Sequence, residues 1–270
     1  MLSSTTSPPS AFDRHRTGLD LLARVEGGSP PALEAALADI APDLARLAID
    51  FAYGDVHARP QLALPQRQLA TVAVLAALGN ARPQLKFHLA GALRVGCTPA
   101  ALVELAIHMA VYVGFPAAVN TALALKEVFD EQGLQPPRSE VAPEPERHAA
   151  GWQRLKDIDG HAGERVIAAL EGIAPDLGRY VIEFAFGDVY SRPAMDLFSR
   201  ELVTVAALTA LGTASAQLAV HLHGFLNVGG TQEQMVEVIT HCAVYAGFPA
   251  AINAALVARQ VMAKRAPAPA

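Results

Sequence analysis

The sequence predicts an all-α protein built from two tandem helical domains. Apolar residues recur at helical spacing through most of the chain, as Leu19, Leu22 and Val25 do near its start. Glycine and proline mark the ends of these stretches, and no segment shows a convincing strand pattern. The halves also repeat: adding 133 to a position gives a similar residue, without a gap from Arg14 to Phe129. A register kept that long indicates one fold written twice.

The repeat divides the chain into two domains that are expected to form an intrachain pseudo-dimer. We expect the first domain over 14–133 and the second over 147–263. Between them, 134–146 is rich in proline and charge, which is typical of a semi-rigid linker. The ends, 1–13 and 264–270, are expected to be a flexible and a disordered tail.

Each copy begins with short helices and a conspicuous polar stretch. In the first copy, a helix is expected over 14–26, a short one through Ile40, and a third from Pro42 to near Gly54. The stretch GDVHARP at 54–60 then predicts an ordered loop. In it glycine would give backbone freedom, aspartate would cap locally and proline would fix the direction.

The second part of each copy contains the apolar helices. The helix over 65–78 is apolar nearly all round, so it is expected to be the buried centre. Pro83 opens the next helix, which carries His88. Thr98 then caps a further helix, and its counterpart Thr231 begins a capping box. The last helix of the copy is expected to end at Gly133.

Composition excludes several classes of partner. The net charge of −5 offers no basic footprint, so nucleic acid is not expected as a partner. The most apolar runs, 69–78 and 202–211, are far shorter than the roughly 20 residues that span a bilayer, so no membrane partner is expected either. The first residues lack an apolar signal core. Cys97 and Cys242 occupy different places in the two copies and suggest no disulfide framework, so a cytoplasmic setting is expected.

Four blocks of the second copy carry a resemblance to a known family. They are GDVYSRP, SRELVTVAALTALG, QLAVHLHGFLNVGGT and YAGFPAAINA, in that order. In order and spacing they resemble the γ-carboxymuconolactone decarboxylase family, over essentially all of both copies. The resemblance implies small all-helical subunits in rings of six, so three tandem chains could rebuild one ring as a homo-oligomer. It also implies loss of carbon dioxide from a carboxylated lactone, without a cofactor.

A sister branch of this family, the alkylhydroperoxidase D type, uses a Cys-x-x-Cys pair one turn before the equivalent of His221. Those places hold Ala214 and Gln217 in the second copy, and Ala81 and Gln84 in the first. Without thiols no disulfide relay can run. Thiol peroxidase activity is therefore not expected.

His88 and His221 are the first candidates for catalysis. Each lies in the middle of a helix in apolar surroundings. A buried imidazole titrates within reach of neutral pH and could deliver a proton to a carbanion or enolate. The alternative is a core histidine that is bonded to a backbone carbonyl.

His223 is the most informative departure from the family. The resemblance implies an arginine here, a plausible clamp for a carboxylate, but the chain has His223 in one copy and Ala90 in the other. Loss of a permanently charged, bidentate donor puts the family's usual substrate in doubt. Two residues along a helix turn a side chain by about 200°, so His221 and His223 are not expected to converge on one atom.

A second set of polar residues repeats at positions i, i+4 and i+8 of a helix. The set is Glu104, His108 and Tyr112, with Glu237, His241 and Tyr245 in the second copy. This spacing puts each triplet on one helix face, where the carboxylate could orient the imidazole. His108, His241 and Tyr245 could therefore bind substrate, or the triplets could form a polar stripe in a subunit contact.

The remaining candidates differ between the copies or flank the predicted loop. Arg59 and Arg192 could neutralise a substrate carboxylate or tie the loop to a helix end. Glu201, a candidate acid, has Gln68 as its counterpart, and Tyr190, a candidate for substrate binding, has His57. These differences predict that the second copy holds the main active site.

We therefore expect a cofactor-independent lyase that removes carbon dioxide from a carboxylated lactone or related cyclic acid. No metal is expected, because the histidines do not form a ligand set, and the resemblance implies that no cofactor is needed. Two alternatives remain open. One is an isomerase, cyclase or lactone-rearranging enzyme with the same acid and enolate chemistry, and the other is a non-catalytic structural or ligand-binding ring.

Overall fold

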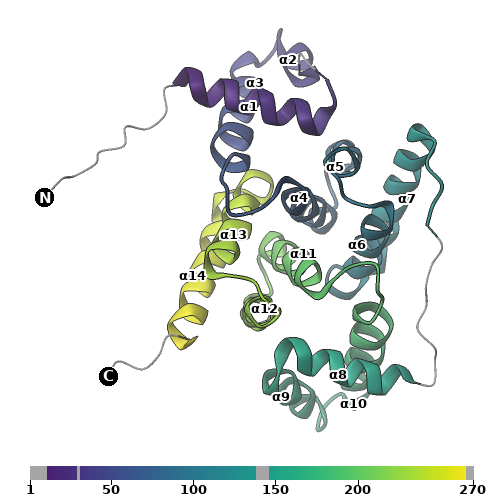
Figure 1. Cartoon of the computed structure of the whole chain (residues 1–270). Coiled ribbons are helices and arrows are strands. Elements are labelled where there is room, and N and C mark those ends of the chain that lie inside the picture. The colour runs from purple at the N-terminus through teal and green to yellow at the C-terminus, as the bar shows by residue number, and fades with distance from the viewer. Residues whose placement is uncertain (1–10, 29–30, 138–145, 266–270) are drawn as a thin grey trace, which may run out of the picture. The chain divides into compact units, whose positions relative to one another are not determined.

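The computed structural model describes residues 11–28, 31–137 and 146–265 (Figure 1). Most of the predicted linker and tails lies outside these residues. None of the described residues forms a strand, so the all-α prediction is confirmed. By its contacts the chain forms two compact units, 1–60 and 61–270. The predicted boundaries at 14–133 and 147–263 follow the repeat rather than these units, and they stay a prediction.

The first unit contains four helical elements. They are α1 (Ala11–Glu26), α2 (Ala32–Leu37), α3 (Pro42–Leu47) and η1 (Ala48–His57). The last is a π-helix, which ends with a bond from the Ala58 amide to the Tyr53 carbonyl, five residues earlier, at 3.1 Å. The loop predicted over 54–60 is therefore wrong, because its first four residues complete this helix.

Close packing of α1 against η1 explains the glycine and aspartate of the GDVHARP stretch. A Cβ on Gly54 would lie 2.4 Å from the Arg14 carbonyl oxygen, so glycine is needed for the approach of two backbones rather than for a turn. Asp55 does not cap locally, because its carboxylate lies 3.0 Å from Nε of Arg14. The sequence revealed an unusual stretch, but its role is contact between helices.

The second copy repeats this arrangement inside the second unit. Its elements are α8 (Arg147–Asp159), α9 (His161–Leu170), α10 (Pro175–Tyr180) and η3 (Val181–Tyr190). A Cβ on Gly187 would lie 2.5 Å from the Arg147 carbonyl oxygen. Arg147 also pairs with Asp188 at 3.3 Å, as Arg14 does with Asp55.

The core of the second unit is shared by both copies. The first copy contributes α4 (Leu64–Leu78), α5 (Arg82–Arg94), α6 (Pro99–Tyr112) and α7 (Phe115–Gln132). The second contributes α11 (Leu197–Leu211), α12 (Ser215–Asn227), α13 (Gln232–Ala246) and α14 (Phe248–Arg265). The equivalent helices α4 and α11 lie side by side (Figure 1), and their apolar residues are almost entirely buried, as predicted.

Two further helices cross between the copies. Helix α6 of the first copy packs against α11 of the second, and α13 of the second packs against α4 of the first. The predicted caps are confirmed: Thr98 accepts a hydrogen bond from the Ala101 amide, and Thr231 forms a capping box with Gln234. Within the described residues, every helix is too short or too polar to cross a membrane.

We expect Gly151→Ala to destabilise the protein. A Cβ at this position would lie 2.0 Å from the Ile182 carbonyl oxygen of η3, so the two backbones must separate. Overpacking of this kind lowers the free energy of unfolding by about 1–3 kcal/mol or more. The control is Gly172→Ala, where a Cβ meets nothing within 4 Å. Urea unfolding measures both variants, and equal stabilities would contradict the packing described here.

Candidate active site

His221 lies on α12 with its ring almost entirely enclosed. Its side chain is 10% exposed, and Nδ1 lies 2.9 Å from the Oε2 atom of Glu201, which is fully buried on α11. Since a carboxylate only accepts, Nδ1 donates, and Nε2 is the ring nitrogen left for a reacting group. Glu201 thus fixes the tautomer and orientation of the imidazole.

Two tyrosines complete this arrangement, which we call the His221 centre: His221, Glu201, Tyr190 and Tyr112. The Tyr190 hydroxyl donates to Oε1 of Glu201 at 2.7 Å and is 2.5 Å from the Tyr112 hydroxyl. Because the Tyr190 proton goes to the carboxylate, Tyr112 is the donor of the second bond. The Tyr112 ring also meets the His221 ring edge-on, with centroids 5.0 Å apart. Tyr112 belongs to the first copy, so the centre is built from both.

The electrostatics of this centre favour a protonated histidine. Burial by itself lowers the pKa of His221, but the charge of Glu201 and its hydrogen bond outweigh burial and raise the pKa above 6.5. Burial and the Glu201 charge hold the pKa of Tyr112 and of Tyr190 well above 10, so both remain protonated. Of the histidine and the two tyrosines, His221 is therefore the group that can exchange a proton near neutral pH.

The equivalent centre of the first copy, the His88 centre, consists of His88, Gln68 and Tyr245. His88 Nδ1 lies 2.9 Å from the Gln68 amide oxygen, and the Tyr245 ring of the second copy meets the His88 ring edge-on at 5.2 Å. Burial lowers the pKa of His88 to about 3, and no carboxylate opposes it. The two centres share their geometry, but only the His221 centre contains an acid.

His108 and His241 have partners that were not predicted. Nε2 of His108 is 2.8 Å from the Thr204 hydroxyl, which itself donates to the Arg200 carbonyl. Thr204 must therefore accept from Nε2–H, which makes His108 a neutral donor. His241 makes the same contact with Thr71 at 2.8 Å. Burial is the main cause that lowers the pKa of both histidines far below 6.5, and nearby arginines add to it.

The helical spacing suggested that Glu104 orients His108, but the structure gives Glu104 other partners. Its carboxylate instead receives two guanidinium groups, from Arg192 at 2.8 Å and from Arg200 at 2.9 Å. Arg192 thus ties the end of η3 to α6, which is the structural alternative considered for it. In the other half, Arg67 contacts Glu237 at 2.7 Å, and both side chains are fully buried. The i, i+4 spacing was misleading because a buried carboxylate binds a cation more strongly than a neutral imidazole.

The remaining candidates have surroundings of their own. His223 faces another side of α12, where its Nδ1 is 3.5 Å from Arg265 and its pKa is lowered by burial and by that cation. His221 and His223 therefore do not converge, as predicted. Arg59 is an exposed residue of the first unit, and His57 of that unit packs on the Tyr53 ring.

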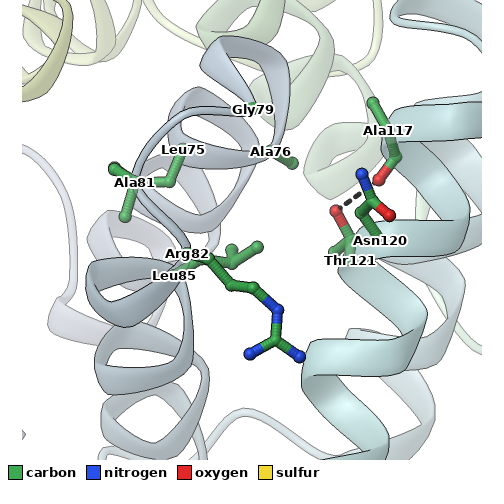
Figure 2. A pocket seen from close by; sticks show the side chains of 9 residues that line it. All are labelled: Leu75, Ala76, Gly79, Ala81, Arg82, Leu85, Ala117, Asn120 and Thr121. Carbon is green, nitrogen blue, oxygen red and sulfur yellow. Dashed lines mark hydrogen bonds between the residues drawn. The ribbon is translucent and has the colours of Figure 1, made fainter.

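A small cavity in the first copy is separate from both centres. It measures about 140 Å³ and is lined by α4, α5 and α7, with Arg82, Asn120 and Thr121 as its polar residues (Figure 2). The matching place in the second copy measures only about 10 Å³ and has Ser215 where the first has Arg82. In the described part of the chain, no group of three His, Cys, Asp or Glu side chains is arranged to hold a metal ion.

Comparison with known proteins identifies the family. The model of the carboxymuconolactone decarboxylase family matches 42–127 and again 175–260, together more than half of the chain. The chain belongs to the carboxymuconolactone decarboxylase family. The second match begins and ends 133 residues after the first, which confirms the tandem arrangement and its register.

Two curated relatives of this decarboxylase-family chain align with less than half of it, about the length of one copy. The 4-carboxymuconolactone decarboxylase of Acinetobacter baylyi is 37% identical over 117 residues, which are 43% of this chain and 87% of the relative. The nitrosuccinic acid decarboxylase of Metarhizium robertsii is 33% identical over 115 residues, which are 42% of this chain and 78% of the relative.

A solved structure matches both copies at once. It is assigned to a gamma-carboxymuconolactone decarboxylase subunit of Burkholderia xenovorans, with a TM-score of 0.58 and 22% identity. The alignment covers 93% of this chain and 98% of the other, so the likeness in fold extends over the whole tandem arrangement. This likeness concerns the fold, and the two curated relatives support a decarboxylase-like enzyme.

We expect the two centres to titrate differently in the purified protein. His221 should take up its proton above pH 6.5, whereas His88 should stay neutral until about pH 3. His88 also makes the free energy of unfolding depend on pH. Below about pH 6.5 the unfolded chain binds a proton at His88 that the folded protein does not bind, so the stability that neutral His88 contributes is lost as the pH falls toward 3. Nitrogen-detected NMR of the imidazoles checks this, with His221→Asn and His88→Asn to assign the signals. Equal titration of both rings would contradict it.

Proposed function

We propose that the protein is a cofactor-independent carboxy-lyase in which His221 protonates the carbon that loses carbon dioxide. The observation that carries this proposal is the buried hydrogen bond between Glu201 and Nδ1 of His221. It leaves Nε2 as a proton donor in a site with little water. The substrate we propose is a carboxylated lactone or a related small carboxylic acid, in keeping with the decarboxylases named among the relatives.

The reaction runs in two steps. The bond between the substrate carbon and its carboxylate breaks, carbon dioxide leaves, and the electron pair passes into an enolate. Nε2 of the His221 imidazolium then gives its proton to the carbon, which forms the new C–H bond and leaves neutral imidazole. Water returns the proton afterwards. A placed acid of this kind accelerates protonation by roughly 10²–10⁴.

Glu201 makes the histidine an acid, and the tyrosines hold Glu201 in place. Its carboxylate stabilises the imidazolium and orients the ring, while the Tyr190 hydroxyl occupies the other carboxylate oxygen at 2.7 Å. Tyr112 in turn donates to Tyr190. Since one tyrosine comes from each copy, we infer that neither copy could form this centre alone.

We further propose one working centre per chain. Gln68 accepts the hydrogen bond of His88 as Glu201 does that of His221, but it carries no charge to stabilise an imidazolium. With a pKa of about 3, His88 is a neutral imidazole at neutral pH and cannot act as an imidazolium acid. The His88 centre retains the architecture without the acid, which agrees with the prediction that the two copies have diverged.

Thiol peroxidase activity is not part of this proposal. The positions of the Cys-x-x-Cys pair hold alanine and glutamine in both copies. Burial raises the pKa of Cys97 and of Cys242 to about 12, so neither forms the thiolate that such chemistry needs. A cytoplasmic setting stays a prediction.

The proposal is tested by release of carbon dioxide from 4-carboxymuconolactone and a panel of related acids. We expect His221→Asn to lower kcat/KM by roughly 10²–10⁴, because it removes the proton donor. The matched control is His88→Asn at the equivalent place of the first copy, which should retain most of the activity.

The outcomes separate the competing functions. Equal activity of the two variants on a substrate that is turned over would contradict the assignment of His221. A product with the same mass as the substrate would instead show isomerisation or cyclisation at the same site.

We also propose that three chains associate into a ring of six copies. The support is a row of exposed apolar side chains that occurs once in each copy. The row contains Phe115, Val119 and Leu123 on α7, and Phe248, Ile252 and Leu256 on α14. Contiguous exposed apolar side chains are typical of surfaces that bind another protein, and the duplication of this row fits contact between copies of this chain.

Light scattering on the purified protein measures this association. We expect the mass of three chains for the natural protein and a smaller mass for the double variant Val119→Lys, Ile252→Lys, because buried unpaired charges oppose association. The control is Gln132→Lys at an exposed position at the end of α7. A single chain for the natural protein at micromolar concentration would refute the proposal.

A further inference from the structure

Asp159 carries a partly buried carboxyl group that the residues discussed so far do not explain. It is the last residue of α8, and its Oδ1 atom is buried without a hydrogen-bond partner. Buried side-chain oxygens in proteins are bonded in the large majority of cases, so an exception requires a physical explanation. Asp159 could not be singled out from the sequence, because the first copy has Glu26 at the same place and neither residue belongs to a motif.

The packing of α8 brings Asp159 to the His221 centre. The carbonyl of the preceding residue, Ile158, accepts a hydrogen bond from Asn227 of α12 at 2.7 Å. A Cβ on Gly224 of α12 would lie 2.8 Å from Ile158 and 2.8 Å from Oε2 of Glu201. The end of α8 therefore lies against the part of α12 that contacts Glu201, one turn after His221.

The charged groups that act on Asp159 lie on α11 and α12. His221 of α12 attracts its carboxylate, and Glu201 of α11 repels it. Burial is the main reason that its pKa rises to about 6, with Glu201 adding to the increase and His221 opposing it. On the α6 side, Asp159 contributes to the raised pKa of Tyr112, and the charge of His221 helps to keep His108 neutral. Tyr190 of η3 is already bonded to Glu201.

We propose that Asp159 is a positioning residue of the His221 centre, a second carboxylate that flanks the imidazole together with Glu201 and keeps a proton on it. Asp159 acts through His221 and does not itself react. The importance of Asp159 for catalysis rests on the proposed lyase function, whereas its effect on the pKa of His221 does not. In an enclosed site the attraction between opposite charges is weakly screened, so a carboxylate without a direct hydrogen bond still stabilises the imidazolium.

The test is the titration of His221 by NMR in Asp159→Asn. We expect the pKa of His221 to fall, because the isosteric amide removes an attractive charge and leaves the shape unchanged. Asp157→Asn is the control: Asp157 lies on the same turn, is paired with Arg154 at the surface, and should leave His221 unchanged. Asp159→Glu keeps the charge and should restore most of the effect.

An identical His221 titration in the natural protein, Asp159→Asn and Asp157→Asn would overturn the proposal. Thermal unfolding of each variant shows whether the fold is intact, and Asp159→Glu provides a second reading if the amide variant does not fold. Once a substrate has been identified, we expect the pH profile of kcat to move to lower pH in Asp159→Asn. Should no acid on the panel lose carbon dioxide, a shifted titration would still support the role of Asp159, and only the lyase function would be lost.

Discussion

The hydrogen bond between the Glu201 carboxylate and the His221 imidazole is the interaction on which the candidate site depends. Burial of an imidazole opposes its charged form, so an isolated histidine in this core would be neutral, as His88 is. The carboxylate reverses that preference at a distance of 2.9 Å. The rest of the second unit serves to keep this pair dry and aligned. The Tyr190 hydroxyl bonds the other oxygen of the carboxylate, and α8 packs over the place where Gly224 has no side chain.

The crossing of α6 and α13 between the copies makes the duplicated chain one functional unit. Each centre receives a tyrosine from the other copy, and the buried Glu104 cluster joins Arg192 and Arg200 across the same boundary. Removing one partner of such a buried cluster costs about 3–5 kcal/mol, so the cluster constrains both copies strongly. Fusion of the copies also lets them differ. A chain with one copy per subunit must repeat every substitution, whereas here residue 68 is a neutral glutamine and residue 201 an acidic glutamate.

The sequence predicted the helices, the buried pair α4 and α11, the caps and the repeat, because all of these depend on local spacing. It also singled out His221, Glu201 and Tyr190. It did not predict that Tyr112 of the first copy reaches the His221 centre of the second, because the crossing of helices between copies is a property of tertiary packing that no spacing encodes. The GDVHARP stretch was interpreted as a loop because the packing role of Gly54 against Arg14 cannot be seen in the chain alone. Asp159 was missed for the same reason, since its neighbours are distant in the sequence.

The central claim is that the Glu201 carboxylate makes His221 a proton donor, whereas the equivalent His88 is a neutral core histidine. The most direct measurement is the pKa of His221 in Glu201→Gln, which gives the second copy the glutamine of the first. If the carboxylate is responsible, burial should dominate in this variant and the pKa should fall below 6.5, toward the behaviour of His88. A pKa that stays above 6.5 in a folded Glu201→Gln protein would contradict the account.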